Sequence, residues 1–275
     1  MEYMSKDFFI FSASIVIITA VSKFIKIRST KYQRARAVES MYSRCTVSAP
    51  GKALIAGGYL VLEHPNIGVT IAATSCFHTT VALQSNTSEN TSEEVLNIFI
   101  DSPQFHITYL FQYDIYRGQL KLISENGNIF IEKCLLLTLV YIREIHGLSL
   151  FTSLLSGLAL AGRLHLKLRA DNDFYSQIHE LKRRNLPLTS SSLRSLPPFL
   201  PCPIEDGRVI VSKTGMGSSA ALVTSLVAAL LHSLGVIHLL SSSSSSTSLP
   251  VSLSTIHTQN EKEREKEKEK EIEKE

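Results

Sequence analysis

Residues 213–221 read Lys-Thr-Gly-Met-Gly-Ser-Ser-Ala-Ala and run directly into an apolar segment that ends near Gly235. Gly215 and Gly217 have no Cβ, so the backbone there can adopt positive φ and come close to a bulky anion. The first amides of a following helix have no partner within the helix and lie at the positive end of its dipole. The stretch therefore predicts a phosphate-binding turn between an extended segment and a helix.

Two serines and two alanines open the predicted helix. Ser218 and Ser219 are suited to cap its N-terminus, and one of them can offer a hydroxyl oxygen to Mg²⁺. Ala220 and Ala221 let the helix pack closely behind the loop. No Lys-Ser/Thr pair follows the second glycine at the Walker A spacing. A turn that merely starts a helix is the plain alternative, and the length of the string, 213–221, favours phosphate binding.

A second motif stands near the start of the globular region. Residues 48–52 read Ser-Ala-Pro-Gly-Lys, and residues 57–63 read Gly-Gly-Tyr-Leu-Val-Leu-Glu. Together with residues 213–221 they resemble the first two signature motifs of the GHMP kinases, the superfamily of galacto-, homoserine, mevalonate and phosphomevalonate kinases. Within it, the chain is similar to the phosphomevalonate kinase family of the eukaryotic type. Further similar stretches lie at 102–104, 171–176, 185–189 and 230–236.

The resemblance covers about residues 45–238 and implies an α+β fold. It implies the GHMP-kinase N-terminal domain, which has the ribosomal protein S5 domain 2-like fold. In this superfamily a third glycine-rich motif, a catalytic carboxylate and a ferredoxin-like C-terminal domain follow. The chain has no Asp after Asp206. We therefore expect the C-terminal domain to be largely missing and the 275-residue chain to have little kinase activity as written.

The resemblance also implies roles for single residues. Lys52 would lie near the transferred phosphoryl group, the alternative being a solvated lysine at a strand end. Asp173, Tyr175 and Ser176 would belong to the acceptor-binding loop, the alternative being a turn with an Asx cap before a helix. Ser219 is the expected Mg²⁺ ligand, with Ser218 as the alternative. The residues expected to bind the ATP phosphates are Lys213, Thr214, Gly215, Met216, Gly217, Ser218, Ser219, Ala220 and Ala221; Lys213 could instead only flank the loop.

The function implied is ATP-dependent phosphorylation of (R)-5-phosphomevalonate to 5-diphosphomevalonate in the mevalonate pathway of isoprenoid biosynthesis. The implied cofactors are ATP and Mg²⁺. Two alternatives stay open: another GHMP small-molecule kinase such as a mevalonate kinase, and a non-catalytic nucleotide-binding remnant.

Charge and cysteine content bound the other partners. The formal net charge is +3, but much of the charge sits in the two ends of the chain. In the part of the chain between these two ends, the numbers of basic and acidic residues are nearly equal, so no nucleic-acid partner is expected. The four cysteines form no Cys-X-X-Cys pair. They are typical of reduced thiols in a cytoplasmic protein.

The ends of the chain differ from its middle. We expect residues 1–40 to be an N-terminal extension, residues 41–238 the ATP-binding domain, and residues 239–275 a disordered tail rich in Ser, Glu and Lys. Residues 8–21 form an apolar run shorter than the roughly 20 residues that span a membrane. This run is either a signal anchor that tethers the domain to a membrane, facing the cytoplasm, or part of a mis-called start before Met41.

The middle of the chain predicts a mixed sheet covered by helices. We expect strands ending at Lys52, through 59–62 and from 69 to 83, then strands within 95–124 broken at 102–103 and 117–118. A helix at about 130–146 with Gly147 as its C-cap, an alternating strand around 164–168 and a helix at 176–184 follow. After a proline-rich connection, 208–212 is predicted as a strand and 218–234 as a buried helix.

Overall fold

The structure is a computed structural model that describes residues 44–85 and 92–239. The described residues up to His238 belong to one compact unit. Our predictions for residues 1–40, for the start at Met41 and for the tail after 239 fall outside the described residues. Among the helices of residues 44–85 and 92–239, none has both the length and the apolar character needed to cross a membrane.

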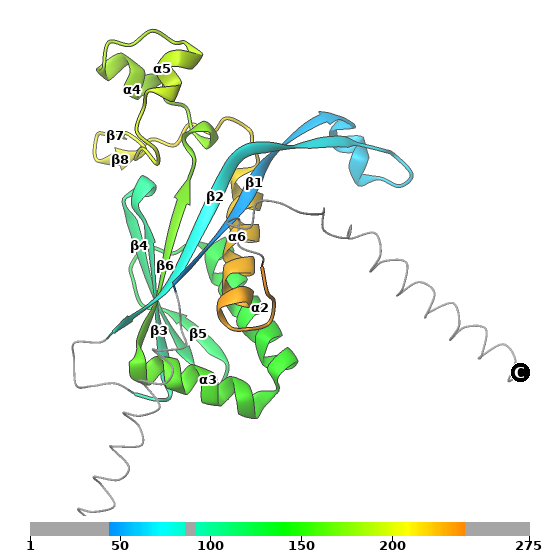
Figure 1. Cartoon of the computed structure of the whole chain (residues 1–275), viewed down its shortest axis with the longest axis vertical. Helices are drawn as coiled ribbons and strands as arrows, with labels where there is room; N and C mark the ends of the chain where they lie inside the picture. The colour runs from blue at the N-terminus through cyan, green and yellow to red at the C-terminus, as the bar shows by residue number, and fades with distance from the viewer. Residues whose placement is uncertain (1–43, 86–91, 240–275) are drawn as a thin grey trace, which may run out of the picture. The chain divides into compact units, whose positions relative to one another are not determined.

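A six-stranded sheet forms the centre of the domain, in the order β1-β2-β6-β3-β4-β5 (Figure 1). β6 pairs antiparallel with β2 and parallel with β3, so the sheet is mixed, as predicted. The strands are β1 Cys45–Ala56, β2 Val69–Ser85, β3 Val95–Ser102, β4 Ile107–Asp114, β5 Gln119–Leu122 and β6 Gly162–Ala170.

Three helices pack against one face of the sheet and enclose the core (Figure 1). They are α2 Ile129–His146, α3 Leu148–Ala161 and α6 Ser218–Ser233. Asn128 caps α2 by accepting hydrogen bonds from two of its first amides, and Gly147 ends it at a φ of 74°. The helices predicted at 130–146 and 218–234 are confirmed; α3 was not predicted.

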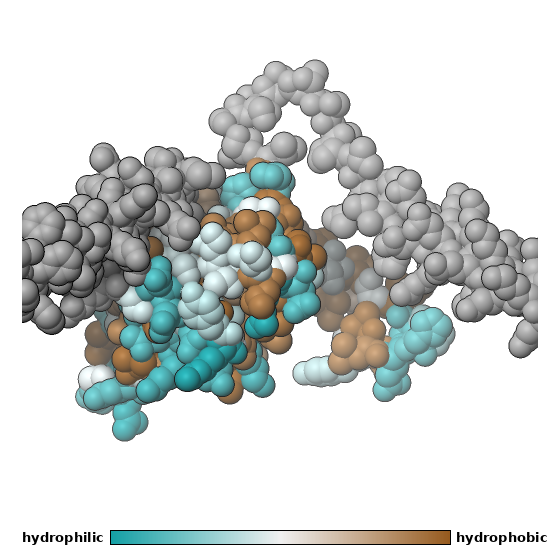
Figure 2. All heavy atoms as spheres, turned by 90° about the horizontal axis from the view of Figure 1, so that it is seen from below, coloured by the Kyte–Doolittle hydropathy of each residue, from teal (hydrophilic) through white to brown (hydrophobic). Residues whose placement is uncertain are grey.

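The opposite face of the sheet is polar. Along β6, buried residues alternate with half-buried ones, which puts Arg163, His165, Lys167 and Arg169 on this second face. The Lys167 ammonium lies 3.4 Å from the Asp101 carboxylate on β3. On the side of the domain seen from below, apolar and polar residues are interspersed (Figure 2).

The β1–β2 hairpin extends beyond the rest of the sheet as an arm (Figure 1). The stretch 59–62, predicted as a strand, is instead part of the 3₁₀ helix η1, Gly58–Leu62. Tyr59 is 92% exposed, Ile67 86% and Leu62 83%. This short apolar run has no neighbouring strand to pair with, so it closes into a single tight helix between β1 and β2.

A group of short elements stands above β4 and β6 (Figure 1). They are η2 Pro103–Phe105, η3 Asn172–Phe174, α4 Ile178–Arg183, α5 Ser190–Arg194, β7 Ile204–Glu205 and β8 Arg208–Val209. The predicted helix 176–184 is present in shorter form as α4. The predicted strand 208–212 is wrong in extent, because only Arg208–Val209 pairs, and it pairs with β7. The proline-rich connection contains α5, which was not predicted.

Candidate functional site

The segment 48–52 lies directly against the loop 213–217. The amide of Lys52 donates a hydrogen bond to the carbonyl of Met216 at 3.0 Å. At Gly51 a Cβ would lie 3.1 Å from this carbonyl and from the Phe174 ring. The two motifs, more than 160 positions apart in the sequence, therefore meet without a gap, and a larger residue at Gly51 would push them apart.

The loop turns into α6 through a left-handed residue. Gly217 has φ 69° and ψ 41° and precedes α6 without a side-chain cap. The prediction that Ser218 or Ser219 caps the helix is wrong, because both serines already lie in its first turn. The carbonyl of Gly217 accepts hydrogen bonds from the amides of Ala220 and Ala221 at 3.0 and 3.1 Å. In the described part of the chain, the amides of residues 215–219 donate no hydrogen bond, so they are available to an anion.

Lys52 lies on the loop itself. A Cβ at Gly217 would be 3.1 Å from Cγ of Lys52, so the lysine stem packs over this glycine. The lysine is exposed, and within the described residues its ammonium has no carboxylate at ion-pair distance. A cation thus stands beside unpaired amides at a helix N-terminus, where a phosphate group would be stabilised by both.

The segment 171–176 connects to the same loop. The Thr214 hydroxyl donates to the carbonyl of Asp173 at 2.6 Å. The amide of Ser176 donates to the carbonyl of Ser212 at 2.8 Å. The carboxylate of Asp173 accepts a hydrogen bond from the Ser75 hydroxyl on β2. The three segments singled out from the sequence therefore converge in space.

Tyr175 and the two serines of α6 have different surroundings. Tyr175 is 5% exposed, and its ring meets the edge of Phe105 at 5.3 Å. Burial raises the pKa of Tyr175 to about 12, although a hydrogen bond with Ser218 lowers it somewhat. Ser218 is buried, whereas Ser219 is exposed. Ser219 is thus the one of the two serines whose hydroxyl can reach a ligand.

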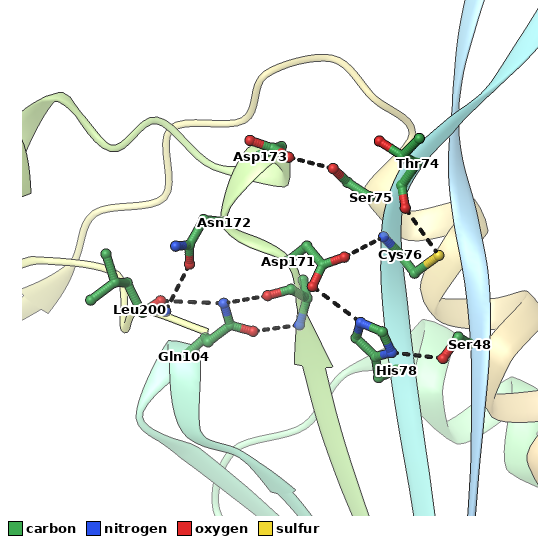
Figure 3. A network of polar contacts seen from close by, with 11 residues as sticks. Ser48, Thr74, Ser75, Cys76, His78, Gln104, Asp171, Asn172, Asp173 and Leu200 are labelled. Atoms are coloured by element: carbon green, nitrogen blue, oxygen red, sulfur yellow. Dashed lines mark hydrogen bonds and ion pairs between the residues drawn. The ribbon is translucent and has the colours of Figure 1, made fainter. Parts of the chain in front are cut away.

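A chain of polar contacts holds the start of this segment to the sheet (Figure 3). The Asp171 carboxylate accepts hydrogen bonds from the Cys76 amide at 2.7 Å and from Nε2 of His78 at 3.1 Å. Nδ1 of His78 lies 2.7 Å from the Ser48 hydroxyl oxygen. Burial and the nearby Asp171 charge raise the pKa of the Cys76 thiol. Sequence reasoning missed His78, since it stands 93 positions from Asp171 with no motif around it.

Gln104, from the Ser-Pro-Gln stretch, fixes the end of β6 below these contacts (Figure 3). Its side-chain amide donates to the carbonyl of Ala170 at 2.9 Å, and its carbonyl oxygen accepts from the Ala170 amide at 2.5 Å. A second donated bond reaches the carbonyl of Leu200 at 3.2 Å. The side chain is 2% exposed and replaces a missing neighbour strand at this position.

A cavity of about 290 Å³ adjoins the converging segments. Ser176 and Ser212, which are joined by a backbone hydrogen bond, form part of its wall. Much of its lining is apolar, from Leu200, Pro201 and Ile210 among others, and its polar lining includes His179 and Arg183. Ser212 immediately precedes the loop that begins at Lys213, so the cavity lies next to the start of this loop.

No His, Cys, Asp or Glu side chains gather in groups of three or more that could hold a metal ion within residues 44–85 and 92–239.

Comparison with known proteins gives a consistent group of relatives. The chain is 33% identical over 206 residues to "Phosphomevalonate kinase, peroxisomal" of Arabidopsis thaliana, covering 70% of this chain and 40% of the relative. It is 31% identical over 213 residues to a phosphomevalonate kinase of Aspergillus fumigatus, covering 67% and 40%. It is 33% identical over 208 residues to that of Gibberella zeae, covering 67% and 39%. The resemblance to phosphomevalonate kinases expected from the motifs is confirmed.

Two other comparisons add less. No known family model matches the chain. Among solved structures, the Lin0012 protein from Listeria innocua has a TM-score of 0.37 at 16% identity, covering 69% of this chain and 36% of that one, a likeness too weak to define the fold. The chain spans about 40% of the length of the curated relatives it matches.

Proposed function

We propose that this chain binds ATP and takes part in the transfer of the γ-phosphoryl group of ATP to (R)-5-phosphomevalonate. The product would be 5-diphosphomevalonate, in the mevalonate pathway. The proposal is supported by the similarity to phosphomevalonate kinases over two thirds of the chain's length. Residues 41–238 would form the ATP-binding domain, with the fold of the GHMP-kinase N-terminal domain. The observation that carries the proposal is the convergence of segments 48–52, 171–176 and 213–221 on one loop.

The phosphates of ATP would bind on residues 213–221. The unpaired amides of residues 215–219 and the N-terminus of α6 provide donors and positive potential for them. Positive φ at Gly215 and Gly217 leaves no Cβ between this backbone and the phosphate. The base and ribose of the nucleotide would extend into the adjoining cavity, where the apolar walls suit a flat ring.

Lys52 would act on the transferred group. Its stem lies over Gly217, so its ammonium can reach a phosphate seated on the loop. In phosphoryl transfer the protein contributes chiefly positioning and charge stabilisation. Lys52 would neutralise the charge that develops on the oxygens of the transferred phosphoryl group.

Ser219 would complete the Mg²⁺ shell. Its exposed hydroxyl stands in the first turn of α6, beside the open amides, whereas Ser218 is engaged by Tyr175. When bound, Mg²⁺ would neutralise part of the charge on the nucleotide phosphates. Ser219 would supply one oxygen ligand, and the other ligands would come from the nucleotide and water.

The acceptor would bind beside segment 171–176. Asp173 accepts a hydrogen bond from Thr214 of the loop through its backbone carbonyl, and Ser176 bonds to Ser212 through its backbone amide, while Tyr175 would act indirectly by holding Ser218. This segment lies between β2 and the phosphate loop, so an acceptor bound there would be close to a nucleotide phosphate on the loop, and such positioning is a main requirement for fast transfer.

Two measurements test the proposal. Isothermal titration of the purified chain with MgATP, MgADP and MgGTP reports nucleotide binding. Lys52→Met should weaken the binding of MgATP more than that of MgADP. Coupled formation of ADP with phosphomevalonate, compared with mevalonate, reports the acceptor. No binding of any nucleotide by the folded protein would overturn the proposal, and turnover of mevalonate alone would reassign the acceptor.

A further inference from the structure

Ser48, His78 and Asp171 form a connected chain of hydrogen bonds that the proposed kinase reaction does not use (Figure 3). The Ser48 oxygen lies 2.7 Å from Nδ1 of His78, and Nε2 of His78 lies 3.1 Å from the Asp171 carboxylate. Ser48 and His78 face each other across the β1–β2 pairing, so the sheet itself sets their distance. The Asp171 carboxylate is held in turn by the Cys76 amide at 2.7 Å.

The contacts define where the protons are. A carboxylate only accepts hydrogen bonds, so in neutral His78 the proton sits on Nε2 and points to Asp171. Nδ1 is then an acceptor, and the Ser48 hydroxyl donates to it. The hydroxyl oxygen keeps its remaining lone pairs free on an exposed residue. A hydroxyl within reach of a base, with the base oriented by a third group, is the arrangement that activates a serine nucleophile.

The positively charged side chain of Arg169 lies next to this chain of hydrogen bonds. Arg169 on β6 is paired with His78 in the sheet register and shares its face. Its guanidinium carbon lies 4.5 Å from the centre of the Phe199 ring, and that ring meets the His78 ring edge-on at 5.4 Å. Nε of Arg169 is buried and has no hydrogen-bond partner among the described residues. Arg169 and Phe199 thus lie against the side of His78 that faces away from Ser48 and help to fix the position of the imidazole ring.

We propose that Ser48 is an activated nucleophile that accepts a small acyl group from an ester and passes it to water. In the first step the Ser48 oxygen bonds to the acyl carbon while its proton moves to Nδ1 of His78. The ester C–O bond then breaks, and the departing alkoxide takes that proton. In the second step water attacks the acyl carbon and gives a proton to His78, and the acid leaves as the Ser48 hydroxyl is restored. Asp171 holds the imidazole in the required tautomer.

The test uses a fluorophosphonate, which bonds to an activated serine oxygen with loss of fluoride. The full chain is incubated with the probe, and the labelled residue is identified by mass spectrometry. We expect a single label on Ser48 and none in Ser48→Ala. His78→Gln keeps a donor toward Asp171 but has no base, so its labelling rate should fall at least about 100-fold.

Ser75→Ala is the matched control. Ser75 lies on β2 and donates to the Asp173 carboxylate, but it has no imidazole partner, so its removal should leave the labelling rate unchanged. A second measurement is independent of the probe's size: Ser48→Cys should react with iodoacetamide faster than the same variant combined with His78→Gln. Labelling no faster than in Ser48→Ala, together with equal alkylation of the two cysteine variants, would overturn the proposal.

Discussion

Replacing Gly217 with valine is expected to abolish nucleotide binding while leaving a folded protein. The residue has φ 69°, a conformation that costs a branched side chain about 1–3 kcal/mol. The new Cβ would also lie 3.1 Å from Cγ of Lys52. For a domain of this size, that loss of stability lowers Tm by roughly 2–12 °C. The fold should survive this change.

The loss of affinity is larger than the loss of stability. A valine side chain would occupy the space in which a phosphate oxygen approaches the amides of the loop. Each charge-assisted hydrogen bond contributes about 1.5–3 kcal/mol. Loss of two such bonds therefore weakens the binding of ADP or ATP at least about 100-fold, since each factor of ten in Kd corresponds to 1.4 kcal/mol. Isothermal titration at 25 °C measures the Kd, and circular dichroism melting measures the stability in parallel.

Gly235→Val is the matched control for this variant. Gly235 has φ 75° just beyond the other end of α6, and a Cβ there would meet nothing within 4 Å. It carries the same kind of backbone strain without touching the loop, so the protein should lose stability but keep its nucleotide affinity. Unchanged ATP affinity in folded Gly217→Val protein would refute the assignment of the phosphate loop.

Three further predictions follow from the same contacts. Ser219→Ala should weaken the binding of MgATP about tenfold, or 1.4 kcal/mol, as measured by titration, and should leave the binding of metal-free ADP unaffected. Equal weakening of both would argue against Ser219 as a metal ligand. Tyr175→Phe should cost about 1 kcal/mol of unfolding free energy in urea through loss of the bond to Ser218, and an unchanged midpoint would contradict that bond. Arg183 and Arg184 hold the pKa of Glu180 down to about 2 from 4.5. This carboxylate therefore stabilises the fold fully above pH 4.5, and its contribution is lost as the pH falls through about 2. Glu180→Gln should lower Tm much more at pH 7 than at pH 2, and an equal loss at both would be inconsistent with the ion pairs.

The sequence predicted elements well where composition and periodicity agreed. Helix α2 has an apolar repeat, an Asn before it and a Gly after it, and each of these signals is local. Helix α3 was missed because it begins directly after Gly147, the residue that ends α2, and has no capping side chain to mark its start. The strand predicted at 59–62 was wrong because a short apolar run becomes a strand only where a neighbouring strand pairs with it.

Only part of the candidate site could be predicted from the sequence, and this too has a physical reason. Glycines mark the phosphate loop in the sequence because the backbone itself needs them there. His78 and Ser48 have no such signal, since their contacts depend on which strands become neighbours. Likewise, Gly217 rather than a serine begins α6, because the loop enters the helix at positive φ, where glycine is far less strained than serine.

The central place of β6 has a consequence during synthesis on the ribosome. β6 pairs with β2 across 77 to 93 residues of intervening sequence, from Ser85↔Gly162 to Phe77↔Ala170. At about 5–20 residues per second, β2 therefore waits roughly 4–19 s after its own emergence before its second neighbour leaves the ribosome. During that interval the hydrogen-bonding edge of β2 is open, and its apolar side chains have only β1 beside them. A nascent chain of this length presents the kind of unpaired strand that a chaperone binds.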